Sequence, residues 1–146
     1  MTFEKINFKK AKIEDIHYLL WLRKVTMSDY MLNSGLEVND KEQLNRINYN
    51  FEDANIIYFD EEKIGLLKIS ERETEIEIVQ IQLDPSFQRK GIGRLILESI
   101  IKNAKNKNKT LFLSVLKANP AKKLYDSMGF KTINTTNDSF EMRLNF

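Results

Sequence analysis

The chain has 146 residues, of which 42% are hydrophobic and 30% are charged, and its formal net charge is +2. This length predicts a single domain over residues 1–146 with a substantial core, and the composition excludes a disordered chain. The sequence has no cysteine and only one histidine, so disulfides and thiolate catalysis are excluded and no metal site is expected. No apolar run is long enough to span a membrane and the first residues do not resemble a signal peptide, so we expect a cytoplasmic protein.

The first half of the chain predicts one strand, two helices and a three-stranded antiparallel meander. Ile6 and Phe8 indicate an edge strand over residues 3–12, and the acidic pair Glu14-Asp15 is placed to begin a helix that runs to about Met31. A second helix is expected after Asn39-Asp40. The strands that follow are separated by charged turns and cover residues 54–59, 64–70 and 76–83.

The second half predicts helices and strands in alternation, followed by a hairpin. Apolar residues at helical spacing begin near Gly91 and continue toward residues 106–108. The apolar run over residues 111–116 is typical of a strand covered on both faces. Asn119 is placed to cap a short helix with Pro120 at its first position. The closing hairpin covers residues 130–135 and 139–146, with inward-facing Phe140, Met142, Leu144 and Phe146.

A loop with two glycines and three cations, residues 84–94, joins a predicted strand to a predicted helix. The first turn of a helix leaves N–H groups without partners, and the helix dipole is positive there. Gly91 and Gly93 let a ligand approach the backbone closely, which favours a phosphate. The alternative is an ordinary turn with cations that serve solubility. The loop cations are Arg89, Lys90 and Arg94, and the predicted buried stripe of the helix is Ile92, Leu95, Ile96, Ser99 and Ile100.

Two stretches carry a resemblance to a known family. The pattern Q-x-x-G-x-G over Gln88–Gly93 resembles motif A of the GNAT superfamily of N-acetyltransferases, which binds the pyrophosphate of acetyl-coenzyme A. Asn119–Phe130 resembles motif B of the same superfamily, N-x-x-A-x-x-L-Y-x-x-x-G-F. The Walker pattern is absent, and Ile96 replaces the last glycine of a dinucleotide fingerprint. The resemblance implies an α/β (α+β) GNAT fold with a mixed, mostly antiparallel sheet of about seven strands and about four helices, in the order β-α-α-β-β-β-α-β-α-β-β.

The resemblance also implies which residues bind the cofactor. The strand before the loop is expected to pair with pantetheine, with the amide of Leu83 as the donor to the thioester oxygen. Tyr125 is the expected general acid toward the coenzyme A sulfur, because a phenol is protonated at neutral pH. Its alternative role is to pack the helix onto the sheet. The predicted cofactor-binding residues are Ile81, Gln82, Leu83, Gln88, Arg89, Lys90, Gly91, Ile92, Gly93, Arg94, Asn119, Lys122 and Tyr125.

The general base and the acceptor site are less well defined by sequence. Glu77 has the spacing from Gln88 of the base glutamate of the histone-acetyltransferase branch, but it is equally well interpreted as a solvent-facing strand residue. A bulge in this strand could change the face that Glu77 occupies, and Gln80 could order a water instead. The acceptor candidates are Trp21, Arg23, Met27 and Tyr30, whose helical spacing also fits core packing. Arg23 could bind an acceptor carboxylate or form a salt bridge.

We therefore expect an enzyme that transfers the acetyl group of acetyl-CoA to a primary amine by direct attack in a ternary complex, because no cysteine is available for an acyl-enzyme. The amine could belong to a small molecule, an amino acid or a protein. The alternative is a non-catalytic GNAT-fold protein that binds or senses acyl-CoA. The lysines near the end of the helix, residues 102–109, are expected to be solvated. No nucleic acid or membrane partner is expected, and the sequence leaves open whether the protein is a monomer or a homodimer.

Overall fold

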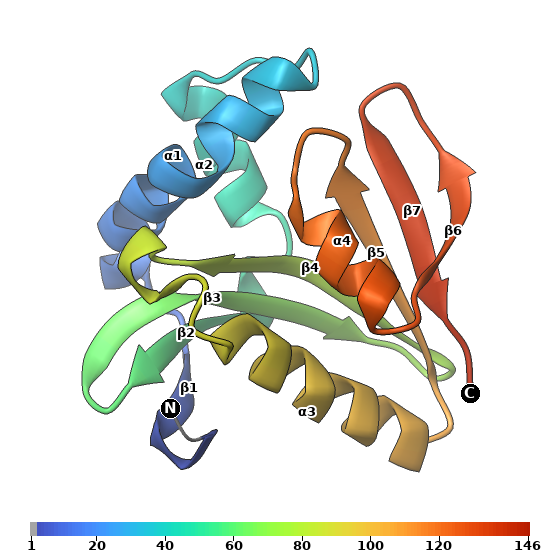
Figure 1. Cartoon of the computed structure of the whole chain (residues 1–146). Coiled ribbons are helices and arrows are strands. Elements are labelled where there is room, and N and C mark those ends of the chain that lie inside the picture. The colour runs from blue at the N-terminus through green and yellow to red at the C-terminus, as the bar shows by residue number, and fades with distance from the viewer. Residues whose placement is uncertain (1–2) are drawn as a thin grey trace.

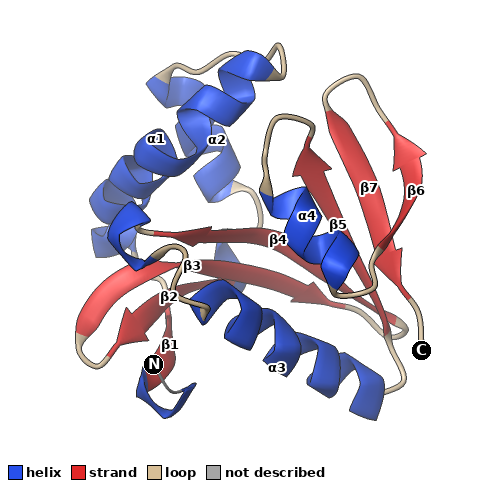
Figure 2. Cartoon of the chain, viewed as in Figure 1, coloured by secondary structure: helices blue, strands red, loops and turns tan. Residues whose placement is uncertain are grey.

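The computed structural model describes residues 3–146, which form seven strands and four α-helices around one sheet (Figures 1 and 2). The strands are β1 (Ile6–Lys10), β2 (Ala54–Phe59), β3 (Glu62–Glu71), β4 (Glu75–Leu83), β5 (Thr110–Leu116), β6 (Lys131–Thr135) and β7 (Ser139–Leu144). The helices are α1 (Ile16–Asn33), α2 (Asp40–Asn48), α3 (Ile92–Asn106) and α4 (Ala121–Ser127). This order of helices and strands confirms the predicted one.

The sheet has the strand order β1-β2-β3-β4-β5-β7-β6. Every neighbouring pair is antiparallel except β4 and β5, which are parallel. The expected mixed, mostly antiparallel sheet is therefore confirmed. The chain crosses from β4 to β5 through α3, as a parallel pair requires.

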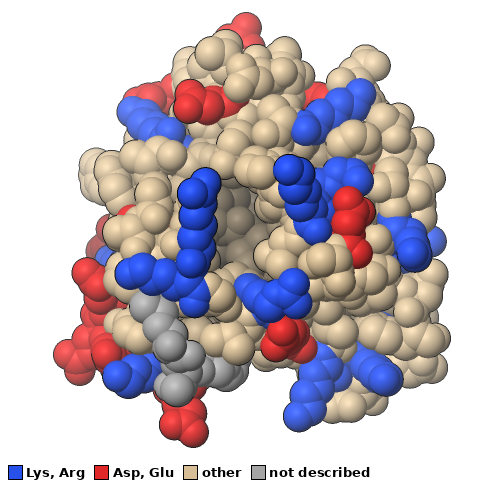
Figure 3. All heavy atoms as spheres, viewed as in Figure 1, with Lys and Arg blue, Asp and Glu red and all other residues tan. Residues whose placement is uncertain are grey.

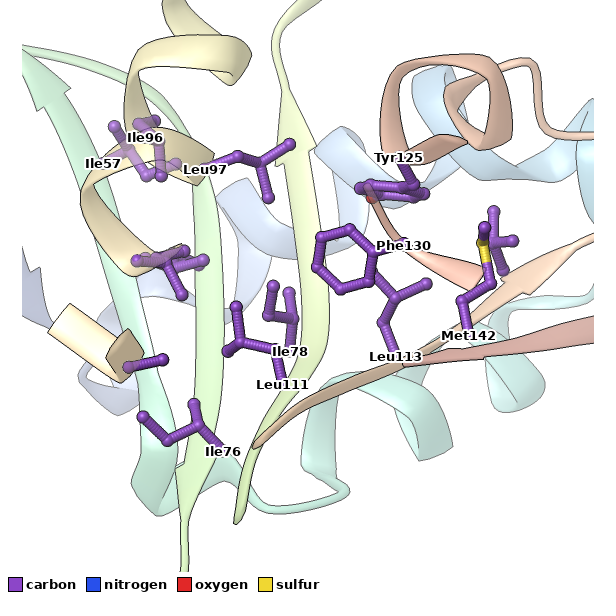
Figure 4. Close-up of a cluster of buried hydrophobic side chains, with 14 of the residues drawn as sticks. Ile57, Ile76, Ile78, Ile96, Leu97, Leu111, Leu113, Tyr125, Phe130 and Met142 are labelled. Carbon is purple, nitrogen blue, oxygen red and sulfur yellow. The ribbon is translucent and has the colours of Figure 1, made fainter. Parts of the chain in front are cut away.

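The two pairs of helices cover opposite faces of the sheet. On one face, Leu97 of α3 and Met142 of β7 belong to a large buried cluster (Figure 4). On the other face, Leu22 of α1 packs with Ile56 of β2 in a second cluster. The next residue of β2, Ile57, belongs to the first cluster, and successive strand residues face opposite sides of a sheet. The apolar runs of the middle strands therefore follow from burial on both faces. Among the described residues, none of the helices combines the length and apolar composition that a membrane span requires.

A few predicted boundaries and faces were wrong. Residues 3–5 form a 3₁₀ turn, and β1 pairs with β2 only over Ile6–Lys10. Phe146 lies beyond the end of β7 and is 49% exposed, because it has no partner strand to turn it inward. In α3 the buried face includes Leu97 and excludes Ser99, which is exposed. The fourth helix begins at Ala121, one residue later than predicted.

A buried carboxylate joins the start of α1 to the second hairpin strand. Asp15 directly precedes α1, and its oxygens accept hydrogen bonds from the Lys12 amide and from Nζ of Lys63 on β3, each at 2.8 Å. Burial alone would raise the pKa of Asp15, but the bonds from Lys63 and Lys12 outweigh it and hold the pKa below its ordinary value. Asp15 was predicted only as an acid at a helix start, and its contact with β3 was not foreseen.

The lowered pKa gives a pH-dependent contribution to stability. The carboxylate form is favoured in the folded chain, so its contribution is present above the unfolded pKa of about 4 and is lost as the pH falls below that value. We expect Asp15→Asn to lower the free energy of unfolding by about 1–2 kcal/mol at pH 7, with a difference that shrinks toward pH 3. Urea denaturation at several pH values measures this difference in the free energy of unfolding. Asp29→Asn, at an exposed position, is the control. A difference that is independent of pH would contradict this assignment.

Candidate active site

The two central strands separate before either one ends. β4 pairs with β5 only from Glu75 to Ile78, opposite Thr110 to Leu113. Beyond Ile78, β4 continues to Leu83 with β3 as its neighbour, while β5 continues to Leu116 with β7 as its neighbour. Figure 1 shows the two strands diverging toward the helix pair α1–α2. One side of the second half of β4 is therefore without a partner strand.

A β-bulge lies in β4 at this point. Lys68 of β3 pairs with Gln80, but the next residue of β3, Ile69, pairs with Ile78, so Val79 is the extra residue. The bulge changes which side chains face which helices. Ile78 before it and Ile81 after it both pack with the core beneath α3, whereas Gln80 faces α2. The sequence allowed a bulge in this strand without giving its position; the structure places it at Val79, two residues after Glu77.

The free side of β4 presents backbone groups to the opening. The Asp84 amide donates to the carbonyl of Ile64 on β3 at 2.7 Å. Because antiparallel residues alternate between bonded and non-bonded positions, Gln82 also bonds β3, and the amides of Ile81 and Leu83 point the other way. Gly65 permits this close pairing, since a Cβ there would lie 2.2 Å from the Gln82 carbonyl oxygen.

The loop between β4 and α3 ends in a run of free amides. None of the N–H groups of residues 89–94 donates to a backbone carbonyl among the described residues. Arg89 and Gly91 have positive φ angles of 61° and 82°, which turn the chain into the helix. Gly93 is not required by packing, because a Cβ there would meet only Leu83 Cδ1 at 3.8 Å. Gln88 Nε2 donates to the Leu83 carbonyl at 2.9 Å and fixes the start of the loop. This arrangement suits an anion at the start of α3.

Cations surround this loop. Arg89, Lys90 and Arg94 are exposed, and Arg94 donates to Ser127 Oγ of α4 at 3.1 Å. Figure 3 shows Lys and Arg side chains around a hollow on the face that carries α3 and α4. Lys122 is bound to its neighbour on α4, Asp126, at 2.9 Å, as a solvated surface lysine would be. The basic potential of the loop thus comes mainly from its own three residues.

A cavity of about 440 Å³ opens where β4 and β5 part. Its walls come from α1, α2, β4, β5, α4 and β7. Several predicted site residues line it, namely Arg23, Met27, Glu77, Ile81, Gln82, Asn119 and Tyr125. Trp21 is 45% exposed and stacks beside Tyr18 at a ring distance of 5.9 Å, and neither Trp21 nor Tyr30 is among the lining residues. Within residues 3–146 no cluster of three or more His, Asp or Glu side chains could hold a metal ion.

Tyr125 lies in the cavity wall with its ring in the core. It is 7% exposed, and its ring meets that of Phe130 edge to face at 5.8 Å (Figure 4). Burial raises the pKa of the phenol to about 12, so the hydroxyl is protonated at neutral pH and can donate a hydrogen bond. The structure therefore confirms that Tyr125 packs in the core and shows that it also lines the cavity, while its role as a general acid stays a prediction.

Glu77 lines the same cavity from β4. Its carboxylate forms an ion pair with Arg72 at 2.7 Å, and Arg72 lies in the turn before β4. Asn119 reaches the cavity from the start of α4, where its Oδ1 accepts the Ala121 amide at 2.9 Å. Asn119 therefore caps the helix as predicted, by accepting a hydrogen bond from the amide of the helix's first residue.

The end of α2 supplies residues that sequence reasoning missed. Arg46 and Tyr49 line the cavity beside Gln80. Buried Lys68 of β3 donates to the carbonyls of Arg46, Ile47 and Tyr49, and Gln80 Nε2 donates to the Arg46 carbonyl at 2.8 Å. Burial, and secondly the charge of Arg23, lowers the pKa of Lys68 to about 8. A lysine inside an apolar strand was the available signal, since a buried ammonium needs acceptors such as the last carbonyls of a helix.

Comparisons with known proteins agree with this geometry. Residues 33–142 match the family model described as acetyltransferase (GNAT) domain. The ribosomal protein bS18-alanine N-acetyltransferase of Salmonella typhimurium is 41% identical over 58 residues, which are 38% of this chain and 39% of that protein. The chain therefore matches well under half the length of this curated relative.

Two solved structures share the fold over nearly the whole chain. The PaiA N-acetyltransferase from Thermoplasma acidophilum, in complex with coenzyme A, has a TM-score of 0.70 at 21% identity, with all of both chains covered. The ribosomal-protein-S18-alanine N-acetyltransferase from Escherichia coli has a TM-score of 0.68 at 20% identity, with 96% of this chain and 93% of that chain covered. At these identities the likeness establishes the fold.

Proposed function

Because the chain belongs to the GNAT acetyltransferase family, we propose that it transfers the acetyl group of acetyl-CoA to a primary amine in a ternary complex. The observation that supports this most strongly is the unpaired run of amides at residues 89–94, next to the opening between β4 and β5. The solved neighbour from Thermoplasma acidophilum contains coenzyme A. These unpaired N–H groups are suited to donate hydrogen bonds to the oxygens of a diphosphate.

The residues present suit the pyrophosphate and pantetheine parts of coenzyme A. The amides of residues 89–94 would hold the pyrophosphate, with Arg89, Lys90 and Arg94 adding positive charge. The amides of Ile81 and Leu83 would pair with the pantetheine arm as an added strand would. When bound, the coenzyme supplies an activated acetyl group at the cavity that Tyr125 lines.

The chain's own groups would carry out the proton transfers of the reaction. Glu77 takes a proton from the acceptor ammonium, directly or through a water near Gln80, so that the nitrogen can attack the acetyl carbon. The Leu83 amide donates to the thioester oxygen as negative charge develops there. The C–N bond forms and the C–S bond breaks, Tyr125 gives its proton to the departing sulfur, and the proton that the new amide nitrogen loses restores the Tyr125 phenol through solvent.

We expect Gly93→Asp to weaken coenzyme A binding while the fold is kept. An acid in the first turn of a helix is favourable for the dipole, but it repels a diphosphate. The dissociation constant for coenzyme A, measured by calorimetric titration, should rise by at least about tenfold, with Ser99→Asp on the same helix as the matched control. Unchanged affinity would place the diphosphate elsewhere.

We expect Tyr125→Phe to slow transfer without weakening coenzyme A binding, since the ring still packs against Phe130. Loss of a general acid should lower kcat by about a hundredfold. Thiol release from acetyl-CoA with a panel of amines measures it, and Tyr58→Phe on β2, outside the cavity, is the control. A kcat equal to that of the unmodified protein would remove Tyr125 from the chemistry. If the unmodified protein binds coenzyme A but no amine in the panel causes thiol release, the alternative of a non-catalytic acyl-CoA binder is favoured.

We expect Glu77→Gln to lower kcat/KM most at neutral pH. The defect should shrink as the pH rises through the pKa of the acceptor amine, because a free amine needs no base. The measurement is kcat/KM as a function of pH, from neutral pH to above the pKa of the acceptor amine. Glu75→Gln, on the same strand but outside the cavity lining, is the control. A defect of equal size at every pH would argue against a base at this position.

A further inference from the structure

Arg23 is a buried cation without an acidic partner. It is 2% exposed on α1 and lines the cavity. Its Nε donates to Gln43 Oε1 at 2.8 Å, and one terminal nitrogen contacts Met31 Sδ at 3.6 Å. No Asp or Glu within residues 3–146 forms an ion pair with it. Burial, and secondly the charge of Arg46, lowers the pKa of Arg23 to about 10, which leaves it charged at neutral pH. A buried charge of this kind is costly unless an anion joins it.

A second guanidinium lines the same cavity. Arg46 lies near the end of α2, and its Nε is buried without a hydrogen-bond partner. Its backbone carbonyl is held by Lys68 and Gln80, so the side chain is fixed at its base while its donors remain available. The acids in the cavity wall do not neutralise the pair. Glu77 is bound to Arg72, and Glu42 forms no ion pair with either guanidinium.

The opposite wall offers hydrogen-bond acceptors. Gln82 is 7% exposed, and its Oε1 has no hydrogen-bond partner. The Oε1 of Gln80 is also buried and unpaired. Both residues line the cavity from β4, on the side of the bulge that faces α1 and α2. Buried acceptors without partners favour a ligand that carries N–H groups. One cavity thus presents cations on the helix wall and acceptors on the strand wall.

We propose that the acetyl acceptor is a small free amino acid whose carboxylate binds Arg23 and Arg46 while its amine lies against Gln80 and Gln82. This inference rests on the proposed acetyl transfer. A carboxylate is the anion that a guanidinium fork binds with two parallel hydrogen bonds. Small size follows from the cavity of about 440 Å³, which the thioester end of the coenzyme must share, and from the depth of Arg23.

Matched pairs of acceptors that differ only in the carboxylate test the proposal. Glycine and β-alanine are compared with glycinamide and β-alaninamide, and a short peptide with an amidated C-terminus is added. We expect kcat/KM for each acid to exceed that of its amide by at least about tenfold. The amide has the less basic amine and hence more free base at neutral pH, so greater amine availability cannot explain a preference for the acid.

Arg46→Gln is the informative variant, because Arg23 is buried and its replacement could prevent folding. We expect the ratio of acid to amide kcat/KM to fall toward one in Arg46→Gln. Lys41→Gln removes the same charge from the same helix outside the cavity and should keep the ratio of the unmodified protein. A ratio that is unchanged by Arg46→Gln overturns the assignment of the carboxylate site.

A binding measurement separates this inference from the proposed function. Calorimetric titration of β-alanine into the protein with coenzyme A should give binding that Arg46→Gln weakens and that β-alaninamide does not reproduce. Such binding without turnover of any amine would support the carboxylate site while acetyl transfer fails. Equal turnover of acids and amides, or preference for the amidated peptide, would overturn the inference and leave acetyl transfer standing. Absence of both binding and turnover would overturn both.

Discussion

The separation of β4 from β5 after Ile78 is the constraint on which the other features of the site depend. A strand inside a sheet has both of its sides satisfied, and loss of one neighbour leaves alternate N–H and C=O groups without partners. In this chain the free amides belong to Ile81 and Leu83 and face an opening and not the core, while the Leu83 carbonyl accepts a hydrogen bond from Gln88. A strand with one free edge must be held in place by side-chain packing on its faces. The side chains of Ile81 and Leu83 pack with the cluster under α3, so the strand is held from one face while its edge stays free.

The other face is held through the bulge. If β4 alternated regularly through Val79, without a bulge, Gln80 would face α3 and Ile81 would face α2. With it, Gln80 and its cross-strand partner Lys68 both reach the carbonyl of Arg46. The bulge therefore fixes the end of α2 over the opening and turns Gln80 and Gln82 toward α1 and α2, where both line the cavity. The irregular backbone and the polar lining have the same cause.

The features of the site that could be predicted from the sequence are those whose residues lie within one continuous stretch of chain. An alternating strand, a loop containing Gly91 and Gly93 and an amphipathic helix follow one another directly, so local rules were sufficient to single out this loop as the candidate anion site. Arg23 could be singled out because an arginine on an apolar-leaning helix face needs an explanation. Its partner Gln43 and its neighbour Arg46 come from another helix, and the packing of α1 on α2 is not encoded locally. Errors at the ends of elements, such as Phe146, have the same origin, since pairing with a distant strand decides where an element stops.

The two groups of cations in this molecule differ in what they can contribute. Arg89, Lys90 and Arg94 are exposed, so water and salt screen them, and they act mainly by attracting a polyanion. Arg23 is buried and only weakly screened, so in the proposed site it would discriminate between ligands through the cost of leaving it without an anion. A hydrophobic residue of similar volume would fill the same position at a lower cost in stability. The presence of a positive charge there, without an acid to neutralise it, is therefore best explained by a ligand that supplies a negative charge.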